Sequence, residues 1–544
     1  MRRAPCRTGD QLPGQALNEQ TGAGMTEPFE LPSRDLVVTR AILERHGAER
    51  PDALCAMGAD GERWTWSEAL EVADRAASAL TARGVVTGDH VLIFLPNGLD
   101  WLRTWWGIAS LGAVMVTVNV SLHGATLRHV CAESGASVII ADPVRAELVA
   151  ELGLDFGVVD PVELATGEAH TPVLDSLPEV WDVHAINFTS GTTGPAKGVL
   201  TPYLATYMGG VNAMGAAGGL TAEDRWLVDT PLFHVSGQMT ALVSMSAGAA
   251  MLVREKFAGV DYWSVVAETG ATHALLVGTM AAYLQAFPPS PAERAHQLRV
   301  VVLAPMVADP ATFRHRFGVA QLCSVYGQTE ISSPLLIPPG AEIVPGSVGR
   351  PRHGVEVRIV DDHDVPVPVG QSGELVVRTE RPWEMNLGYF GHPAESMTAW
   401  RNGWFHTGDV FRRDAEDNYF YVDRIRDTLR RRGENISSYE VEAAVTAHPD
   451  VLEAACVGIA ADLGEHEVKV FVVPVDGRTI DPSALIRFLI ERLPRFMLPR
   501  FIEVVSALPK NQTLRVQKFV LRTLPNTDHT WDRLKTAEFG RTTR

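Results

Sequence analysis

A short loop at residues 188–198 constrains this chain more than any other segment. Its sequence, FTSGTTGPAKG, places four hydroxyl side chains, three glycines and one lysine close together. Residues 185–188 are typical of a buried strand end and residues from 199 onward of the next apolar element, so the loop is braced at both ends. Glycine lets backbone N–H groups close around anionic oxygens, the hydroxyls add donors, and Lys197 supplies a mobile positive charge. The loop therefore predicts a polyphosphate-binding site.

Two other interpretations of this loop fit the residues less well. A Walker loop ends in Gly-Lys-Ser/Thr, whereas here Lys197 is followed by Gly198. An ordinary P-loop NTPase is therefore disfavoured. A glycine-rich surface turn is the structural alternative, and the density of hydroxyls and glycines around one lysine argues against it.

The bulk composition narrows the class of protein. With 544 residues, 46% of them hydrophobic, the chain can bury large cores, and its length suggests about two to four structural units. A formal charge of -17 argues against a nucleic acid partner and favours a freely soluble enzyme. The five cysteines are scattered without metal-like pairing, so we expect a reduced, cytoplasmic setting with neither a disulfide framework nor a structural zinc.

The N-terminal segment carries no visible export signal. Residues 1–24 are polar and Gly-rich and lack the apolar core that a secretory signal needs. A more ordinary start follows at Met25, so we expect residues 1–24 to be a disordered leader or a start-site artefact. The longest uncharged apolar stretch, residues 105–120, is 16 residues long. It is too short to span a bilayer and predicts a core helix that leads into a strand.

The hydrophobic pattern along the chain predicts two domains. Residues 63–140 and 226–325 alternate helical patterns with short Val/Ile/Leu runs, which is typical of βα units in a mainly parallel sheet. Residues 346–377 change to short strands separated by Asp, Pro and Gly, and residues 424–432 carry five arginines before a fresh α+β pattern begins. We therefore expect an α/β fold with a large N-terminal domain of parallel-sheet βα layers at 25–423, including a β-rich subdomain at 346–423, a small mobile α+β C-terminal domain at 424–525 and a polar tail at 526–544.

Three further clusters, far apart in sequence, suit the same nucleotide. Residues 326–330 follow an apolar strand and offer an aromatic face for a base, a hydroxyl, and a carboxylate for Mg²⁺. Residues 403–409 place Asp409 in a glycine-framed turn suited to the two ribose hydroxyls, and Arg424 opens the run of positive charge. Each cluster also has a structural interpretation, as an aromatic core turn, a β-turn or a solvated basic face. Their occurrence together favours a nucleotide site.

In this order and spacing the motifs resemble those of the adenylate-forming superfamily, which includes acyl-CoA synthetases, peptide-synthetase adenylation domains and luciferases. The likeness runs from about residue 40 to residue 523. It implies that an acid oxygen attacks the α-phosphorus of ATP and releases pyrophosphate, and that a nucleophile, often the thiol of CoA, then displaces AMP. It also implies that fixed cations and oriented donors stabilise the developing negative charge, and that the small domain rotates between the steps.

The resemblance assigns roles to individual residues. Thr329 and Glu330 match the positions that meet phosphate and Mg²⁺, and Arg426 falls at the hinge. The implied catalytic residues are Arg515, Lys197, Glu330 and His234. The implied ATP-binding residues are Thr189, Ser190, Gly191, Thr192, Thr193, Gly194, Tyr326, Thr329, Asp409 and Arg424.

The implied acid pocket draws on three segments. Residues 231–234 match a family motif whose histidine, His234, lies near the substrate acid and the thiol tunnel, although by itself this residue is as readily a core histidine. After the strand at 300–303 the family tends to have a small Gly/Ala-rich turn, whereas Pro305 here removes an N–H and Met306 is bulky. An unusual substrate and drift in a permissive loop are both open explanations. The implied pocket residues are His234, Val235, Gln238, Gly278, Ala304, Pro305 and Met306.

A second departure from the family lies near the C-terminus. Where the family usually has Thr-Gly-Lys, this chain has Leu514 in place of the glycine and Arg515 in place of the adenylation lysine. Arginine keeps the charge, but its planar fork differs from the compact ammonium that can sit between the acid and the α-phosphate. Lys518 is too far along the chain to be a simple substitute, and Lys510 lies on the other side of the turn.

The CoA side follows the family more closely. Residues 430–437 resemble the loop whose glycine, here Gly433, lies along the pantetheine tunnel. Arg430 could meet a CoA phosphate, and Glu434 belongs to the same acceptor-side loop. A solvated basic surface is the alternative.

Three functions remain open at this point. The first is an AMP-forming ligase that uses ATP and Mg²⁺ to adenylate a small or aromatic carboxylic acid and passes it to CoA. The second keeps the ATP site but activates nitrite and delivers it to an aromatic amine, as some superfamily members of secondary metabolism are thought to do, since Arg515 and the turn at 304–306 would suit a different oxyanion. The third is a nucleotide-binding protein weakened in catalysis by Arg515. The acid and the oligomeric state stay undetermined.

Overall fold

The computed structural model describes residues 30–170, 173–189, 196–215, 219–257, 259–425, 429–431, 434–460, 466–510, 516–536 and 539. The chain divides into two units. The first runs to Met280 and adds Pro289–Glu356 and Val377–Phe405. The second contains Ala281–Pro288, Val357–Val376 and the chain from His406 onward.

Short apolar runs form a six-stranded sheet in the first unit. Strands such as Val114–Thr117 and Val138–Ala141 are buried along their whole length, as expected of parallel strands covered on both faces. The strands pair in parallel, except that β8 runs antiparallel beside β7. In sheet order they are β6 (Gly157–Val159), β5 (Val138–Ala141), β3 (His90–Phe94), β4 (Val114–Thr117), β7 (Val183–Phe188) and β8 (Gly198–Pro202).

A nine-stranded sheet forms the other framework of this unit. Its central strands pair in parallel, while β2, β14 and β15 are added antiparallel at the two edges. In sheet order the strands are β15 (Arg350–Pro351), β14 (Ser332–Ile337), β13 (Gln321–Gln328), β12 (Val300–Ala304), β11 (His273–Val277), β9 (Arg225–Val228), β10 (Ala250–Val253), β1 (Leu54–Met57) and β2 (Arg63–Thr65).

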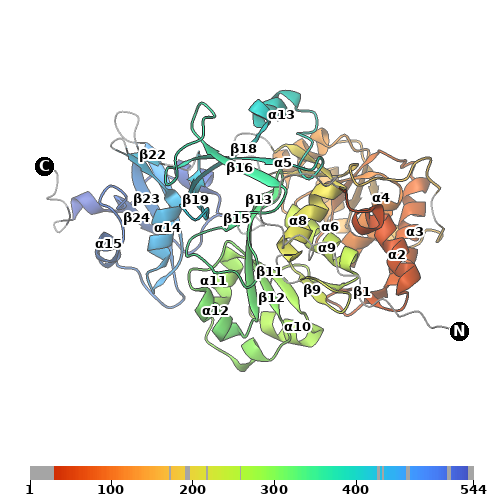
Figure 1. Cartoon of the computed structure of the whole chain (residues 1–544), viewed down its shortest axis with the longest axis horizontal. Helices are drawn as coiled ribbons and strands as arrows, with labels where there is room; N and C mark the ends of the chain where they lie inside the picture. Colours follow the sequence, from red (N-terminus) through yellow and green to blue (C-terminus); the bar gives the residue numbers. More distant parts are fainter. Residues whose placement is uncertain are drawn as a thin grey trace, which may run out of the picture. The chain divides into compact units, whose positions relative to one another are not determined.

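Helices fill the layer between the two sheets and cover their outer faces. The helix α8 (Tyr203–Gly215) contacts β7 and β8 of the smaller sheet and β13 and β14 of the larger one, and α9 (Val235–Ala247) lies beside it against β9 and β10 (Figure 1). The other helices up to residue 403 are α1 (Arg34–Val37), α2 (Thr39–Glu49), α3 (Trp66–Ala82), α4 (Leu99–Ser110), α5 (Gly124–Glu133), α6 (Pro143–Ala150), α7 (Pro161–Leu164), α10 (Tyr262–Thr269), α11 (Gly278–Ala286), η2 (Pro291–Arg294), α12 (Pro310–Phe317), α13 (Pro393–Ala399) and η3 (Arg401–Gly403).

The helices α3 and α4 lie side by side (Figure 1), and small residues line their contact. Thr65 and Glu68 form a capping box that starts α3, and the buried face of this helix is mostly alanine. A Cβ atom built on Gly107 of α4 would lie 2.5 Å from the Cβ of Ala76 in α3, so only glycine allows this approach. Residues 105–120, predicted as a core helix leading into a strand, form the end of α4 and then β4.

The second unit is smaller and mixes strands with short helices. It contains most of a four-stranded sheet, ordered β16 (Val355–Val360), β17 (Gly373–Thr379), β18 (Phe405–Arg413) and β19 (Tyr419–Arg424). Its own core lies between a second four-stranded sheet and the helices α14 and α15. The remaining elements are β20 (Leu429–Arg431), β21 (Glu434–Ile436), α14 (Ser438–Thr446), β22 (Val451–Ala460), β23 (His466–Pro474), α15 (Pro482–Ile490), β24 (Phe501–Val504), α16 (Lys518–Thr523), β25 (Trp531–Asp532) and η5 (Arg533–Lys535).

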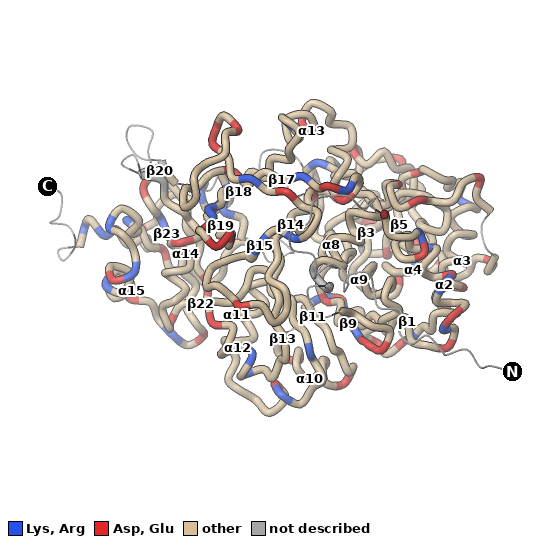
Figure 2. The backbone as a smooth tube through the Cα atoms, in the orientation of Figure 1, with Lys and Arg blue, Asp and Glu red and all other residues tan. Residues whose placement is uncertain are grey.

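The predicted fold class is confirmed: the protein is α/β, with a large N-terminal part built on parallel sheets and a smaller C-terminal part. Among the described residues no helix has both the length and the apolar character needed to cross a bilayer. Figure 2 shows acidic and basic residues interspersed along the chain in both units. The exact domain boundaries, and the leader at 1–24, stay predictions.

Candidate active site

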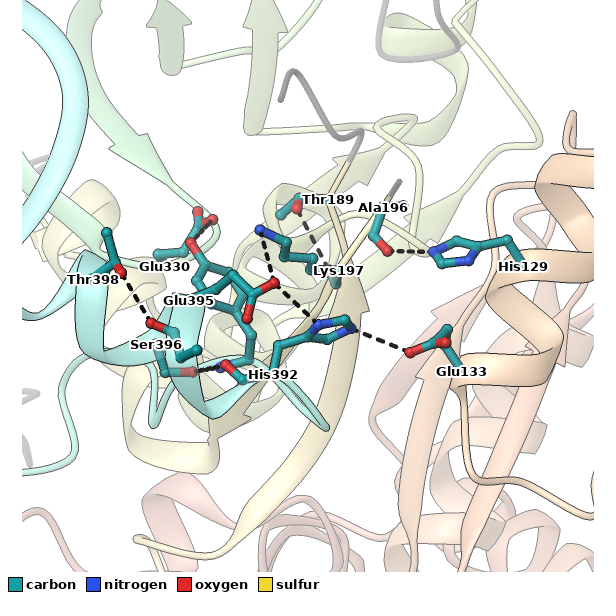
Figure 3. Close-up of polar contacts among 12 residues, drawn as sticks. His129, Glu133, Thr189, Ala196, Lys197, Glu330, His392, Glu395, Ser396 and Thr398 are labelled. Carbon is teal, nitrogen blue, oxygen red and sulfur yellow. Dashed lines mark hydrogen bonds and ion pairs between the residues drawn. The ribbon is translucent and has the colours of Figure 1, made fainter. Parts of the chain in front are cut away.

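The base of the predicted phosphate loop is built by two adjacent strands. The loop leaves β7 at Phe188 and returns into β8 at Gly198, and these two residues face each other in the antiparallel pair. Across this neck the N–H of Thr189 donates to the carbonyl oxygen of Lys197 at 3.1 Å. The ring of His129 in α5 donates from Nε2 to the carbonyl oxygen of Ala196 at 2.8 Å (Figure 3). Strand pairing and α5 therefore hold the end of the loop that carries Lys197.

Lys197 is partly exposed and lies among residues that the sequence did not single out. Its Nζ is 4.0 Å from Oε1 of Glu395 in α13 and 5.6 Å from the centre of the Tyr389 ring. His392 lies between Glu395 and Glu133 of α5, with Nδ1 3.5 Å from Glu395 and Nε2 3.2 Å from Glu133 (Figure 3). The ammonium group of Lys197 thus lies near both an aromatic ring and a carboxylate.

Glu330, the predicted Mg²⁺ residue, lies in the turn between β13 and β14. Its backbone oxygen accepts hydrogen bonds from the N–H of Asn386 at 3.0 Å and from Nδ2 of Asn386 at 2.6 Å. The carboxylate oxygen Oε1 accepts a hydrogen bond from the hydroxyl of Tyr389 at 3.2 Å. Burial, and after it the negative charge of Glu330, raises the pKa of Tyr389 above its ordinary value, so the phenol stays protonated and donates.

The other two residues of this cluster lie in the same segment. Tyr326 is in β13, where its hydroxyl accepts a hydrogen bond from Nε2 of Gln328 at 3.3 Å, and Thr329 is half-buried in the turn. Gly327 lets β14 approach, since a Cβ atom there would lie 2.0 Å from the carbonyl oxygen of Ser332. The turn that carries Glu330 is therefore tightly closed.

His234 directly precedes α9 and caps its N-terminus. Its Nδ1 accepts a hydrogen bond from the N–H of Ser236 at 3.2 Å, which leaves the proton of the neutral ring on Nε2. Val235 and Gln238 are buried behind it. Nε2 of Gln238 donates to Oδ1 of Asn187 in β7 at 2.8 Å, so this residue braces the strand that leads into the phosphate loop.

Two predicted pocket segments meet at the edge of the larger sheet. Val277 and Ala304 are partners at the carboxyl ends of the parallel strands β11 and β12, so the turns that follow them are neighbours. A Cβ atom on Gly278 would lie 3.0 Å from Cδ of Pro305, and the Ala304–Pro305 peptide bond is cis. Met306 next to them is half-buried. Gly278 and the turn at 304–306 are thus brought together, as a shared pocket requires.

The predicted ribose residues Asp409 and Arg424 also meet, in the second unit. They are partners on the antiparallel strands β18 and β19, and Nε of Arg424 lies 2.8 Å from Oδ1 of Asp409. The N–H of Asp409 donates to Oγ1 of Thr407 at 3.1 Å, and Oγ1 of Thr407 donates to the carbonyl oxygen of Leu375 at 2.7 Å. Strand pairing therefore joins two residues that the sequence predicted separately.

The two lysines near Arg515 are both engaged by carboxylates. Lys510 is paired with Glu453 of β22, and Nζ of Lys518 lies 2.8 Å from Oε1 of Glu442 in α14. Several predicted residues lie outside the described part of the chain: Ser190, Gly191, Thr192, Thr193, Gly194, Arg426, Gly433, Arg515 and the side chains of Arg430 and Glu434.

Sequence reasoning missed Tyr389, Asn386, Glu395 and His392. They lie in residues 386–395, inside the predicted β-rich subdomain at 346–423 but outside every motif recognised in the sequence. The one available signal was an aromatic pair between two glycines at 388–391, which is typical of a tight turn with an exposed ring.

The chain belongs to the AMP-binding enzyme family. Residues 43–390 match the family described as AMP-binding enzyme, and residues 440–514 match the AMP-binding enzyme C-terminal domain. The chain is 31% identical over 505 residues to the crotonobetaine/carnitine--CoA ligase of Proteus mirabilis, covering 86% of this chain and 95% of that protein.

Solved structures of CoA ligases share the fold. The anthranilate CoA ligase AuaEII, in complex with anthranoyl-AMP, superposes with a TM-score of 0.81 at 25% identity, covering 91% of this chain and 98% of that one. The o-succinylbenzoate CoA synthetase MenE of Bacillus subtilis, in complex with ATP and magnesium ion, superposes with a TM-score of 0.78 at 25% identity, covering 87% and 98%.

Proposed function

We propose that this protein is an AMP-forming acid–CoA ligase that adenylates a small or aromatic carboxylic acid and transfers the acyl group to CoA. The relatives that match over most of their length are CoA ligases, which supports the assignment. One geometric observation carries it further: Lys197 and Glu330, from separate segments, both contact Tyr389. The side chain of Tyr389 thus contacts both a cation suited to phosphate, Lys197, and a carboxylate suited to a metal ion, Glu330.

The chemistry needs two displacements. In the first, a carboxylate oxygen of the acid bonds to the α-phosphorus of ATP, and the bond from that phosphorus to the bridging oxygen of pyrophosphate breaks. In the second, the thiol sulfur of CoA bonds to the acyl carbon, its proton is lost, and AMP leaves. Lys197 and the donors of its loop would neutralise charge on the phosphate oxygens, with Arg515 near the acid and His234 beside the acyl group.

The donor set fits Mg²⁺ carried with the nucleotide. Glu330 offers one oriented carboxylate, and among the residues described no group of three or more His, Cys, Asp or Glu could hold a metal ion. Proteins commonly bind Mg²⁺ through one or two carboxylates together with substrate phosphates, which matches a single carboxylate here. Glu330 would hold the ion, which would supply further charge neutralisation at the phosphates.

Product analysis tests the assignment. The purified protein is incubated with Mg-ATP, CoA and a panel of acids that includes carnitine-like, anthranilate-like and benzoate-like members, and AMP, ADP, pyrophosphate and acyl-CoA are separated by liquid chromatography. We expect acid-dependent AMP and pyrophosphate, with CoA consumed in equal amount. Formation of ADP and orthophosphate would refute the proposal.

The same assay covers the alternatives. Pyrophosphate release that depends on nitrite and an aminobenzoate-like amine, without any response to carboxylic acids, would replace the ligase by a nitrite-activating enzyme. No turnover with any substrate, combined with ATP binding, would favour a nucleotide-binding protein that has lost catalysis. No observation on the described residues favours either over the ligase.

A further inference from the structure

The segment at residues 386–390 joins the two charged residues of the candidate site. On one side Asn386 donates its backbone N–H and its side-chain amide to the carbonyl oxygen of Glu330. On the other side the segment runs along β8, the strand that begins directly after Lys197. The N–H of Leu387 donates to the carbonyl of Leu200, and the N–H of Leu200 donates to the carbonyl of Gly388, both at 3.0 Å.

Tyr389 is held firmly within this segment. It forms a bridge with Val199 of β8, and its N–H donates to Oγ of Ser396 at 2.8 Å. Oγ of Ser396 in turn donates to the carbonyl oxygen of His392 at 2.8 Å, which closes the turn into α13. The backbone of Tyr389 is therefore fixed to the same strand that carries the end of the phosphate loop.

The hydroxyl group and the ring of Tyr389 contact different residues. The hydroxyl donates to the carboxylate of Glu330 at 3.2 Å, and the ring lies 5.6 Å from Nζ of Lys197. A cation at this distance from an aromatic face is attracted to it without losing its own hydrogen-bond donors, so Lys197 stays able to bind phosphate.

The ion pair between Glu395 and Lys197 is weaker and more exposed than the hydrogen bonds that fix Tyr389. The two charged atoms are 4.0 Å apart, and the Glu395 side chain is 43% exposed. An ion pair of this kind in water is weak and exchangeable, so an incoming phosphate can replace the carboxylate. The ring of Tyr389, by contrast, is half-buried and attached to β8, and it stays in place when the ion pair is lost.

We propose that Tyr389 is a positioning residue that holds the Glu330 carboxylate and the Lys197 ammonium at a set spacing, so that the phosphates of one nucleotide and their Mg²⁺ are received together. The proposal rests on the proposed function in taking Glu330 and Lys197 as nucleotide ligands. The two ends of the side chain give separable effects. Loss of the hydroxyl affects the carboxylate alone, and loss of the ring affects the lysine as well.

Calorimetric titration with ATP, with and without Mg²⁺, tests this for the full chain and needs no acid substrate. In Tyr389→Phe we expect ATP affinity in Mg²⁺ to fall by about fivefold to tenfold, the size of one typical hydrogen bond, and affinity in EDTA to stay within about twofold. In Tyr389→Leu we expect affinity to fall under both conditions, because the ring contact with Lys197 is lost too.

Tyr262→Phe is the matched control. It makes the same chemical change at a buried tyrosine whose hydroxyl has no hydrogen-bond partner among the described residues, and it is expected to bind ATP like the unchanged protein. Thermal unfolding of each variant detects general loss of folding. Equal losses of affinity with and without Mg²⁺ in Tyr389→Phe, or no loss at all, would overturn the proposal.

The outcome separates this proposal from the proposed function. If the unchanged protein binds ATP in a Mg²⁺-dependent way that Tyr389→Phe reduces, but forms no AMP with any acid, the ligase assignment is wrong and the role of Tyr389 stands. If AMP forms normally while Mg²⁺ adds nothing to ATP affinity, the ligase assignment stands and the role of Tyr389 is wrong.

Discussion

Lys510 and Lys518 flank Arg515 in the sequence, and each is held by a glutamate of the second unit. Burial opposes the charge of Lys518, yet Glu442 and a second nearby carboxylate outweigh it and raise its pKa. Moving Lys518 into an active site would leave the largely buried carboxylate of Glu442 without its cation, which costs on the order of 3 to 5 kcal/mol. We therefore expect Arg515 itself to act in the first half-reaction.

Substitution of this arginine tests that expectation. In Arg515→Lys we expect the fold to be unchanged and the Mg-ATP affinity to stay within about twofold, because the positive charge is kept. The rate of acid-dependent pyrophosphate exchange is expected to change, because the ammonium of lysine differs in shape from the guanidinium of arginine. Calorimetry measures the first quantity and isotope exchange the second. A collapse of nucleotide affinity would show that Arg515 does not lie beside the reacting acid.

Asp229, at the end of β9, is buried, and neither carboxylate oxygen has a hydrogen-bond partner in the described part of the chain. Burial raises its pKa from 3.8 to about 7, with Arg254 opposing the shift. The folded protein therefore binds this proton more tightly than the unfolded chain does. Its contribution to stability is largest below pH 4 and is lost as the pH rises toward 7.

Replacing Asp229 by Asn removes this titration. At pH 8 we expect Asp229→Asn to unfold with a free energy higher than that of the unchanged protein by on the order of 2 kcal/mol, and the gap to shrink toward pH 5. Urea unfolding at pH 5, 6.5 and 8 measures the difference. A gap that does not change with pH would contradict the assigned pKa.

At the scale of elements, the contact between α3 and α4 depends on the absence of a side chain. In Gly107→Ala the added methyl group would meet Ala76 at 2.5 Å, and the nearest atoms behind it are backbone. We expect a net loss of about 1 to 2 kcal/mol in the free energy of unfolding, because overpacking outweighs the gain in helix propensity.

Gly209→Ala in α8 is the control for this prediction. Its added methyl would meet the sulfur of Met239 and Oγ of Ser332, both at 2.8 Å. The sulfur belongs to a flexible side chain that can move, and moving Oγ of Ser332 costs one hydrogen bond to the carbonyl oxygen of Ala205 but requires no shift of the backbone. We expect a smaller loss than for Gly107→Ala in thermal or urea unfolding. Equal effects would mean that the fixed backbone of α3 does not set the cost.

At the scale of the whole molecule, three buried histidines predict that the free energy of unfolding falls at acid pH. Burial lowers the pKa of His46 to about 4, of His184 to about 3 and of His273 to about 4, from an ordinary value of 6.5. The unfolded chain takes up protons below pH 6.5 while the folded chain does not. The stability that neutral burial provides is therefore present above pH 6.5 and lost as the pH falls toward 4.

Unfolding experiments measure this loss directly. Between pH 7 and pH 5 the three histidines together lower the free energy of unfolding by about 5 kcal/mol and Asp229 offsets about 2 kcal/mol of this, so we expect a net fall of about 3 kcal/mol, and a smaller fall in His184→Gln, which cannot titrate. Chemical denaturation at fixed temperature across this range supplies the slopes. A flat profile, or an unchanged slope in the variant, would contradict the prediction.

The sequence by itself determined the family and the fold class. Strand and helix periods are local, and the phosphate loop, residues 326–330 and Asp409 each carry their chemistry within a few residues, so they can be recognised without knowing what surrounds them. The tertiary structure alone decided which side chains meet. Tyr389 reaches Glu330 and Lys197 because residues 386–390 pair with β8, and Lys518 is committed to Glu442 because α14 and α16 both pack against β22. Such contacts join segments far apart in the chain, and no local pattern encodes them.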